Sequence, residues 1–312
     1  FPQHQSARFL VIPFVCGIVA TSCGRAQTAD AIKEDVEFGS HQNTTLRGTL
    51  WKPAGASEPV PAIVCVHGSG KVDRNGDYIT ELADYFSRRG VAVLCFDKRG
   101  VSSSDGEYVG SYSSSMIVYA MDGLAALDYL RSRDDIASDQ VGVFGVSQGG
   151  FLIPVLAAVA KDKLAFSIIV SGPTVSIMEQ NRYCDLTGIS AGRDSGMNID
   201  EVYRELEKTE PKGFGPMPYI AEMTMPALWL FGEHDKSIPI RVSIQDLNEV
   251  KQEFDRNFTW QVFPDANHGL RKSKTGGNWE RPYPVEPADG YLESIARWLH
   301  DTVGIGVHET DQ

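Results

Sequence analysis

The 312-residue chain has few cysteines, and none of them is spaced as a metal ligand or a Cys-x-x-Cys pair would be. Of the five, Cys65 and Cys95 each lie inside an apolar run that is typical of a strand. We expect free buried thiols at both positions, with a disulfide between them as the alternative if their strands are neighbours.

The chain also lacks any run of Lys or Arg and any hydrophobic stretch long enough to cross a bilayer. The chain has 29 basic and 41 acidic residues, which gives a net charge of −12. This balance argues against a nucleic-acid or anionic-membrane partner and favours a neutral or cationic substrate over a polyanion. The remaining composition, 42% hydrophobic and 22% charged, is that of a globular protein with a sizeable core.

A run of twelve mostly apolar residues, 9–20, follows Arg8 near the N-terminus. It is too short to span a bilayer and is followed by small and polar residues, which is typical of a secretory signal peptide. We therefore predict a signal peptide over residues 1–26, truncated because no initiator Met precedes it, and an exported protein that is periplasmic or secreted. The alternative is a lipoprotein-type signal with a lipid anchor at Cys23. A buried N-terminal helix is disfavoured because Pro13 interrupts the run.

From about residue 31, segments typical of strands and helices alternate, with no repeat and no low-complexity linker. Continuous apolar runs such as residues 61–66 are typical of strands that are buried on both faces. The alternation predicts an α/β fold with a doubly wound, mainly parallel sheet over residues 31–303, with ligands at the carboxyl ends of its strands. Residues 172–226 are too long for an ordinary connection. We predict a small helical cap there, inserted between the sixth and seventh strands and including a helix near residues 198–208; a plain surface excursion is the alternative.

Residues 145–150 read Gly-Val-Ser-Gln-Gly-Gly and lie between two apolar runs, 140–144 and 151–160. This pattern is typical of a tight turn from a strand into a helix, with Ser147 at the apex in a strained backbone conformation. Glycines at 145 and 149 let strand and helix approach each other. The helix that begins there points backbone N–H groups toward a developing oxyanion. We therefore predict that Ser147 is a nucleophile.

A serine hydroxyl needs a base to remove its proton and a carboxylate to orient that base. His268 is the best placed of the seven histidines, because it follows the last predicted strand among turn-forming residues. For the carboxylate we choose Asp235, which follows another buried strand. Glu233 in the same loop and Asp265 just before His268 are the alternatives, and His234 is read as a neighbour of the acid.

The turn at residues 67–70, His-Gly-Ser-Gly, directly follows a buried strand. Its glycines allow backbone N–H groups to face a developing negative charge. We assign the oxyanion hole to the backbone N–H groups of Ser69 and Gln148, with Gly70 as a substitute for Ser69. His67 is expected to be a structural hydrogen-bonding residue.

A calcium-like alternation of Asp73, Asn75 and Asp77 follows that turn. Tyr78 stands where such a loop needs glycine, and Asp84 stands where it needs glutamate. We therefore predict no metal site and read the segment as a polar loop beside the cleft.

With Ser147, Asp235 and His268 in that order behind the His67-Gly68 turn, the chain resembles the α/β-hydrolase family from about residue 31 to residue 303. Residues 96–104, Phe-Asp-Lys-Arg-Gly-Val-Ser-Ser-Ser, also resemble the D-x-R-G-x-G-x-S loop of that family, with Ser102 in place of the usual glycine. In the family this loop is mainly architectural.

The doubled glycine after Ser147 resembles that of exported bacterial esterases. This resemblance implies a serine hydrolase that cleaves small carboxylic esters through an acyl-enzyme, without a cofactor. Gly149-Gly150 is also similar to serine peptidases of the prolyl-oligopeptidase group, so an aminopeptidase-like or oligopeptidase-like enzyme is the alternative, although the chain has no room for their usual propeller domain. A non-catalytic binding protein is disfavoured because all three members of the triad are present. The oligomeric state is left open.

Overall fold

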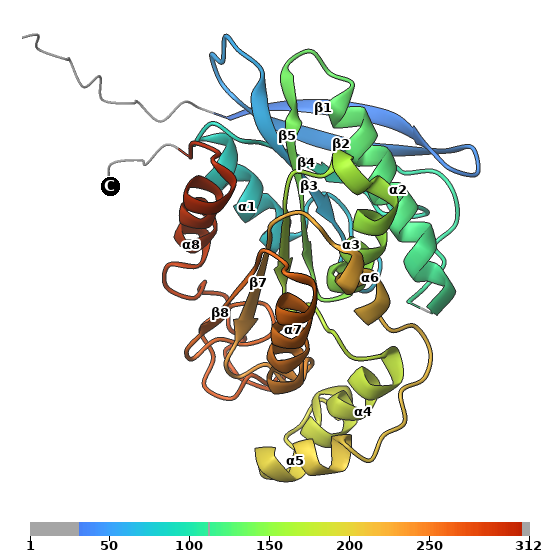
Figure 1. The fold of residues 1–312 in the computed structure, drawn as a ribbon, viewed down its shortest axis with the longest axis vertical. Coiled ribbons are helices and arrows are strands. Elements are labelled where there is room, and N and C mark those ends of the chain that lie inside the picture. The colour runs from blue at the N-terminus through green and yellow to red at the C-terminus, as the bar shows by residue number, and fades with distance from the viewer. Residues whose placement is uncertain (1–30, 112, 308–312) are drawn as a thin grey trace, which may run out of the picture.

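The computed structural model describes residues 31–111 and 113–307, which fold around one eight-stranded sheet (Figure 1). The strand order is β1-β2-β4-β3-β5-β6-β7-β8. β1 and β2 form an antiparallel hairpin, β2 pairs antiparallel with β4, and all further pairs are parallel. The sheet is therefore mainly parallel, as the sequence predicts. The strands are β1 (Ala31–Ser40), β2 (Thr44–Pro53), β3 (Val60–Val66), β4 (Ala92–Phe96), β5 (Ile136–Val146), β6 (Ser167–Val170), β7 (Ala227–Gly232) and β8 (Phe258–Phe263). The predicted signal peptide and Cys23 lie outside the described residues.

Helices cover both faces of this sheet, each over its own hydrophobic cluster. Side chains alternate across a strand, so β3 sends Val64 and Val66 into one cluster and Ile63 and Cys65 into the other. One face carries α1 (Asp77–Ser87), α8 (Tyr291–Trp298) and its π-helical extension η3 (Leu299–Val303). The other face carries α2 (Ser113–Arg131), α3 (Gln148–Ala160) with the short η1 (Lys161–Lys163), α6 (Met217–Glu222) and α7 (Ile240–Phe254). The sheet is therefore doubly wound.

Helix α1 ends before the glycine that follows it in the sequence, Gly90. α1 ends at Ser87, and Arg88 is its C-cap in right-handed conformation. Gly90 follows with φ +95° and turns the chain into the strand that begins at Ala92. The glycine is therefore required by the turn rather than by the helix end.

The two strand cysteines are free thiols. Cys65 and Cys95 are buried on the same face of the sheet, on neighbouring strands that pair in register just before them. Burial raises the pKa of the Cys65 thiol, so it stays protonated at neutral pH.

The segment between β6 and β7 contains three α-helices and a short 3₁₀ turn: α4 (Ile177–Thr187), η2 (Ile189–Ala191), α5 (Ile199–Leu206) and α6. Asn198 is the N-cap of α5, within the range predicted to be helical. α4 and α5 pack on each other through Tyr183, Leu186, Val202 and Leu206, a cluster separate from the two main cores. They project at the bottom of Figure 1, beyond the carboxyl ends of β7 and β8.

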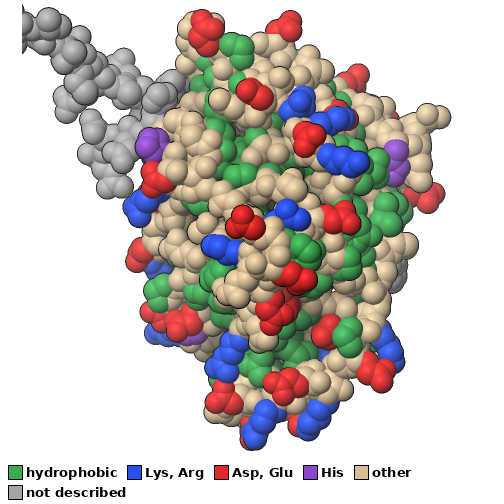
Figure 2. Space-filling model, in the orientation of Figure 1, with side chains coloured by type: hydrophobic (Ala, Val, Ile, Leu, Met, Phe, Trp, Pro, Cys, Tyr) green, Lys and Arg blue, Asp and Glu red, His purple; other side chains and the backbone are tan. Residues whose placement is uncertain are grey.

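Charges on the surface are mixed rather than sorted by sign. On the face shown in Figure 2, acidic and basic side chains are interspersed with hydrophobic ones. Within the described residues, no helix combines the length and the apolar character that crossing a membrane would require.

Candidate active site

Ser147 lies at the junction between β5, which ends at Val146, and α3, which begins at Gln148. Its φ of 57° and ψ of −111° are a strained combination for a residue with a side chain. Two backbone hydrogen bonds hold this conformation: the Ser147 N–H donates to the Val170 carbonyl at 2.9 Å, and the Gly150 N–H donates to the Ser147 carbonyl at 2.8 Å. The backbone at Ser147 is therefore bent as a nucleophilic turn requires.

The glycines around Ser147 are not equally constrained. A Cβ at Gly145 would lie 2.7 Å from Val66 Cγ2, and a Cβ at Gly150 would lie 2.3 Å from the Cα of Gly172. At Gly149 the nearest atom would be 3.5 Å away, an ordinary contact. The close approach expected at Gly149 is therefore found at Gly150, because this part of α3 packs against the backbone that leaves β6.

His268 and Asp235 form a hydrogen-bonded pair in the loops after β8 and β7. The His268 Nδ1 lies 2.9 Å from Asp235 Oδ2. The Asp235 side chain is fully buried, and its other oxygen accepts from the N–H groups of Ser237 at 2.7 Å and Ile238 at 2.9 Å. The carboxylate is thus fixed by three hydrogen bonds, while 27% of the His268 side chain remains exposed.

Asp235 also sets the protonation of His268. Desolvation lowers the pKa of His268, but the charge of Asp235 and the hydrogen bond between them outweigh it, so that the pKa lies above its ordinary value of 6.5. Because a carboxylate only accepts, Nδ1 carries a proton and Nε2 is left to accept one.

The alternative candidates group together elsewhere in these loops. Glu233, His234 and Asp265 bring three possible metal-ligand atoms within 4.8 Å of one another, with both carboxylates exposed. The Asp265 N–H donates to Glu233 Oε2, and His234 Nδ1 bonds the Ser273 carbonyl at 2.8 Å. These contacts leave Asp235 as the carboxylate that is hydrogen-bonded to His268.

Helix α4 holds the loop that carries Asp235, a contact that the sequence does not reveal. The Tyr183 hydroxyl donates to the Asp235 carbonyl at 3.1 Å, and the Thr187 hydroxyl donates to the Lys236 carbonyl at 2.6 Å. The Cys184 thiol lies 3.5 Å from the next carbonyl, at residue 237. The four-residue spacing of Tyr183 and Thr187 places them on one helical face, which is the sole local sign of this function.

The predicted oxyanion turn follows β3, the strand beside β5. His67 bonds the Phe96 carbonyl through Nε2, and burial followed by the charge of Lys98 lowers its pKa to about 4. His67 is therefore neutral and structural at neutral pH. Within the described chain, the backbone N–H groups of Ser69 and Gln148 donate to no protein acceptor.

The sheet brings the predicted residues to one edge. The Ser69 turn, Ser147, Asp235 and His268 follow β3, β5, β7 and β8, which are all parallel. Among these predicted site residues the structure contains one direct contact, the hydrogen bond between Asp235 and His268; Ser147 makes no hydrogen bond to either. Catalytic hydrogen bonds of enzymes without substrate are commonly long, so this arrangement is compatible with proton transfer from Ser147.

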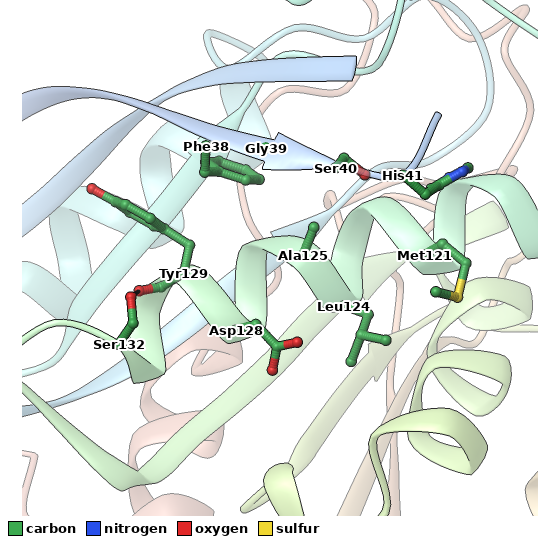
Figure 3. A pocket seen from close by; sticks show the side chains of 10 residues that line it. All are labelled: Phe38, Gly39, Ser40, His41, Met121, Leu124, Ala125, Asp128, Tyr129 and Ser132. Carbon is green, nitrogen blue, oxygen red and sulfur yellow. Dashed lines mark hydrogen bonds between the residues drawn. The ribbon is translucent and has the colours of Figure 1, made fainter. Parts of the chain in front are cut away.

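A cavity of about 440 Å³ lies between β1 and α2 (Figure 3). None of the predicted catalytic residues lines it. Its lining residues are Phe38, Gly39, Ser40, His41, Met121, Leu124, Ala125, Asp128, Tyr129 and Ser132.

The sequence is similar to those of several known proteins. The sequence profile of the prolyl oligopeptidase family matches residues 79–283, a span that includes Ser147, Asp235 and His268. The chain is 27% identical to esterase EstD of Thermotoga maritima over 287 residues, which are 81% of this chain and 65% of EstD. The chain spans 65% of the length of EstD, and 57% and 40% of the lengths of two other curated relatives.

Solved structures share the fold at low sequence identity. The acylaminoacyl peptidase of Pyrococcus horikoshii superposes with a TM-score of 0.62 at 18% identity, over 91% of this chain and 43% of the peptidase. The α/β-hydrolase GrgF of a Penicillium species superposes with a TM-score of 0.58 at 19% identity, over 88% of this chain and 99% of GrgF.

Proposed function

Because the chain belongs to the prolyl oligopeptidase family and has the α/β-hydrolase fold, we propose that it is a serine hydrolase that cleaves carboxylic esters. One observation carries the proposal: the strained Ser147 lies at the same sheet edge as a histidine that is hydrogen-bonded to a buried carboxylate. The similarity to the esterase EstD supports an ester as the substrate.

In this proposal His268 is the general base. Its Nδ1 is bound to Asp235, so Nε2 removes the proton from the Ser147 hydroxyl as Oγ attacks the ester carbonyl. The buried Asp235 holds the ring in this tautomer and stabilises the imidazolium that forms. Protonated His268 then gives its proton to the leaving alkoxide oxygen as its bond to the carbonyl carbon breaks; the alcohol departs, and Ser147 retains the acyl group.

Water completes the cycle by the same route. His268 takes a proton from water, the resulting hydroxide attacks the acyl-enzyme, and the carboxylic acid leaves as Ser147 regains its proton. In both halves the negative oxygen is stabilised by the N–H groups of Ser69 and Gln148, which have no acceptor within the described chain. All groups used in these steps belong to the protein or the substrate.

An aminopeptidase-like or oligopeptidase-like activity is the second candidate. The family match and the shared fold with an acylaminoacyl peptidase favour it. The same nucleophile, base and oxyanion hole would act on an amide, so the difference lies in what surrounds Ser147. We propose that the segment between β6 and β7 makes that choice, since its helices extend past the strand ends where the site lies.

One comparison tests both candidates. The protein and Ser147→Ala are incubated with a fluorophosphonate probe, with short nitrophenyl esters and with aminoacyl nitroanilides. We expect labelling and ester turnover by the wild type and neither by Ser147→Ala. A wild type that is not labelled and turns over nothing would refute the hydrolase. Turnover of amides above that of esters would establish the peptidase instead.

A further inference from the structure

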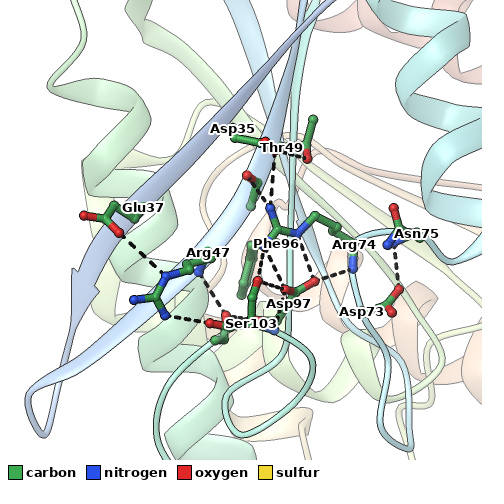
Figure 4. Close-up of polar contacts among 12 residues, drawn as sticks. Asp35, Glu37, Arg47, Thr49, Asp73, Arg74, Asn75, Phe96, Asp97 and Ser103 are labelled. Atoms are coloured by element: carbon green, nitrogen blue, oxygen red, sulfur yellow. Dashed lines mark hydrogen bonds and ion pairs between the residues drawn. The ribbon is translucent and has the colours of Figure 1, made fainter.

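Three consecutive charged side chains after β4, Asp97, Lys98 and Arg99, are all almost completely buried. Arg74 Nη2 donates to Asp97 Oδ2 at 2.8 Å (Figure 4), and Arg99 Nε donates to Asp122 Oδ2 at 2.7 Å. In the described chain no carboxylate lies within ion-pair distance of Lys98.

The loop around Lys98 is held firmly from both sides. Burial raises the pKa of Asp97, but hydrogen bonds from Arg74 and Ser103 more than reverse this and keep the pKa well below its ordinary value. Ser102, at the position where the related loop has glycine, adopts φ +50° to let the chain return to Asp97. The ion pairs on either side therefore fix the backbone of Lys98.

The Lys98 ammonium uses all three of its hydrogens on neutral oxygens of the predicted site. Nζ donates to the carbonyl of Gly68 at 2.9 Å, to the carbonyl of Gly70 at 3.2 Å and to Gln148 Oε1 at 2.8 Å. The Tyr119 ring lies 4.3 Å from Nζ. A buried cation without a counter-ion destabilises the folded state, so packing alone does not explain a lysine at this position.

These contacts determine how the two proposed oxyanion donors are held. The carbonyl of Gly68 and the N–H of Ser69 belong to one trans peptide and point in opposite directions. Binding of the carbonyl by Lys98 therefore fixes the direction of the Ser69 N–H. Hydrogen bonding of a cation to the carbonyl also polarises the peptide and makes its N–H a better donor. The third hydrogen bond anchors Gln148, whose backbone N–H is the other donor.

We propose that Lys98 is a positioning residue that assembles the oxyanion hole, by holding the Ser69 turn and Gln148 with one ammonium group. This inference rests on the proposed function, since it assigns Lys98 to the same hydrolytic site. Lys98 does not contact the substrate in this role. It acts on the transition state through the two N–H groups that it orients.

This role predicts that kcat falls at alkaline pH, when Lys98 loses its proton. Burial lowers the pKa of Lys98 to about 8. Above that pH the amine has two hydrogens for three acceptors and no charge, so the turn is held less well and kcat falls. Activity that depends on the charged form is complete below this pKa and is lost as the pH rises through it.

His67, Tyr78 and Tyr119, which lie around the Ser69 turn and Lys98, have pKa values well away from 8. Burial, then the charge of Lys98, lowers the pKa of His67 to about 4, and burial raises the pKa values of Tyr78 and Tyr119 to about 12. The neighbouring Asp97 and Arg99 are paired, and the Tyr108 ring lies 5.8 Å away. A kcat decline centred near pH 8 therefore reports Lys98.

Lys98→Met tests the proposal, because it keeps an unbranched side chain one heavy atom shorter and removes the charge and the donors. We expect kcat for a nitrophenyl ester to fall about 100-fold with KM changed less than about threefold, as when one oxyanion donor is lost. The decline near pH 8 should disappear. Thermal unfolding checks that the variant is folded, because the loss of Nζ leaves three acceptor oxygens without their donor. A purely structural lysine would instead leave kcat of the folded variant, and its decline near pH 8, unchanged.

Lys71→Met is the matched control. Lys71 is an exposed lysine beside the same turn, 5.6 Å from the Tyr108 ring, and makes no hydrogen bond to the turn among the described residues. We expect its kcat within about twofold of the wild type, with the decline near pH 8 retained. A Lys98→Met enzyme that behaves like this control would overturn the proposal.

Two further measurements decide the question if Lys98→Met does not fold. Gln148→Glu puts a carboxylate against Nζ and raises the pKa of Lys98, so the decline in kcat should move to higher pH; a decline that stays near 8 counts against Lys98. A wild-type kcat that is flat between about pH 7 and 9.5 overturns the proposal whatever the variants do. Failure of the wild type to react with the fluorophosphonate would instead refute the hydrolase itself.

Discussion

Replacement of Asp235 by asparagine isolates the charge of the carboxylate from its place in the loop. The Asn oxygen can still accept from the N–H groups of Ser237 and Ile238, so the loop keeps both of these hydrogen bonds. The amide NH₂ then faces His268 Nδ1, which has to give up its proton to accept from it. His268 is thereby held in the tautomer with Nε2 protonated, which cannot take the proton of Ser147.

The expected loss in kcat is large. A wrong tautomer in a triad of this kind costs about 10⁴-fold in kcat, or about 5.5 kcal/mol of activation free energy. The pKa of His268 changes as well. Only desolvation remains to act on it once the charge of Asp235 is gone, so we expect it to fall from above 6.5 to below that value. Because the neutral ring is the base, activity is lost as the pH falls through this pKa, and the acid limb of the residual activity moves to lower pH.

The assay is kcat for a short nitrophenyl ester between about pH 5 and 7.5, with thermal unfolding as the test of folding. Glu233→Gln is the matched control, since Glu233 is exposed in the same loop and contacts Asp265 rather than His268. We expect this control to change kcat less than about threefold. An Asp235→Asn enzyme within tenfold of the wild type, or a Glu233→Gln enzyme with the larger loss, would refute the assignment of the acid.

Two further predictions concern the support of the site. Gly150→Ala should lower the free energy of unfolding by more than about 2 kcal/mol, because its Cβ would lie 2.3 Å from the Gly172 Cα. Gly149→Ala has room for a Cβ and should lower this free energy by less than about 1 kcal/mol. Equal losses for the two variants in urea unfolding would contradict the packing described. Tyr183→Phe should lower the free energy of unfolding by about 1 kcal/mol and kcat severalfold, because the hydrogen bond to the Asp235 carbonyl is lost. An unchanged kcat would show that α4 does not support the proposed acid.

Much of the fold could be predicted from the sequence because its signals are local. Apolar runs identify buried strands, and the glycines around Ser147 mark a turn whose strained backbone the structure contains. The positive φ of Ser102 likewise falls where the related loop has a glycine. In each case a few adjacent residues contain both the pattern and its physical reason.

The contacts that the sequence did not predict join segments far apart in the chain. Lys98 reaches Gln148 across 50 residues, and Tyr183 reaches the Asp235 carbonyl across 52. The residues next to Lys98 and Tyr183 in the sequence do not indicate which distant residues these side chains contact. The close packing at Gly150 rather than Gly149 is similar, since it depends on where Gly172 lies after β6.

The segment between β6 and β7 contacts the α/β core at two points that support the proposed site. At its start Gly172 lies against Gly150 in the helix behind Ser147, and its first helix donates hydrogen bonds to the backbone at Asp235 and Lys236. It is therefore a poor candidate for exchange as a module. A chimera that takes this segment from a relative to change selectivity would also replace the supports of the proposed nucleophile and acid, unless residues 172, 183 and 187 are kept from the recipient.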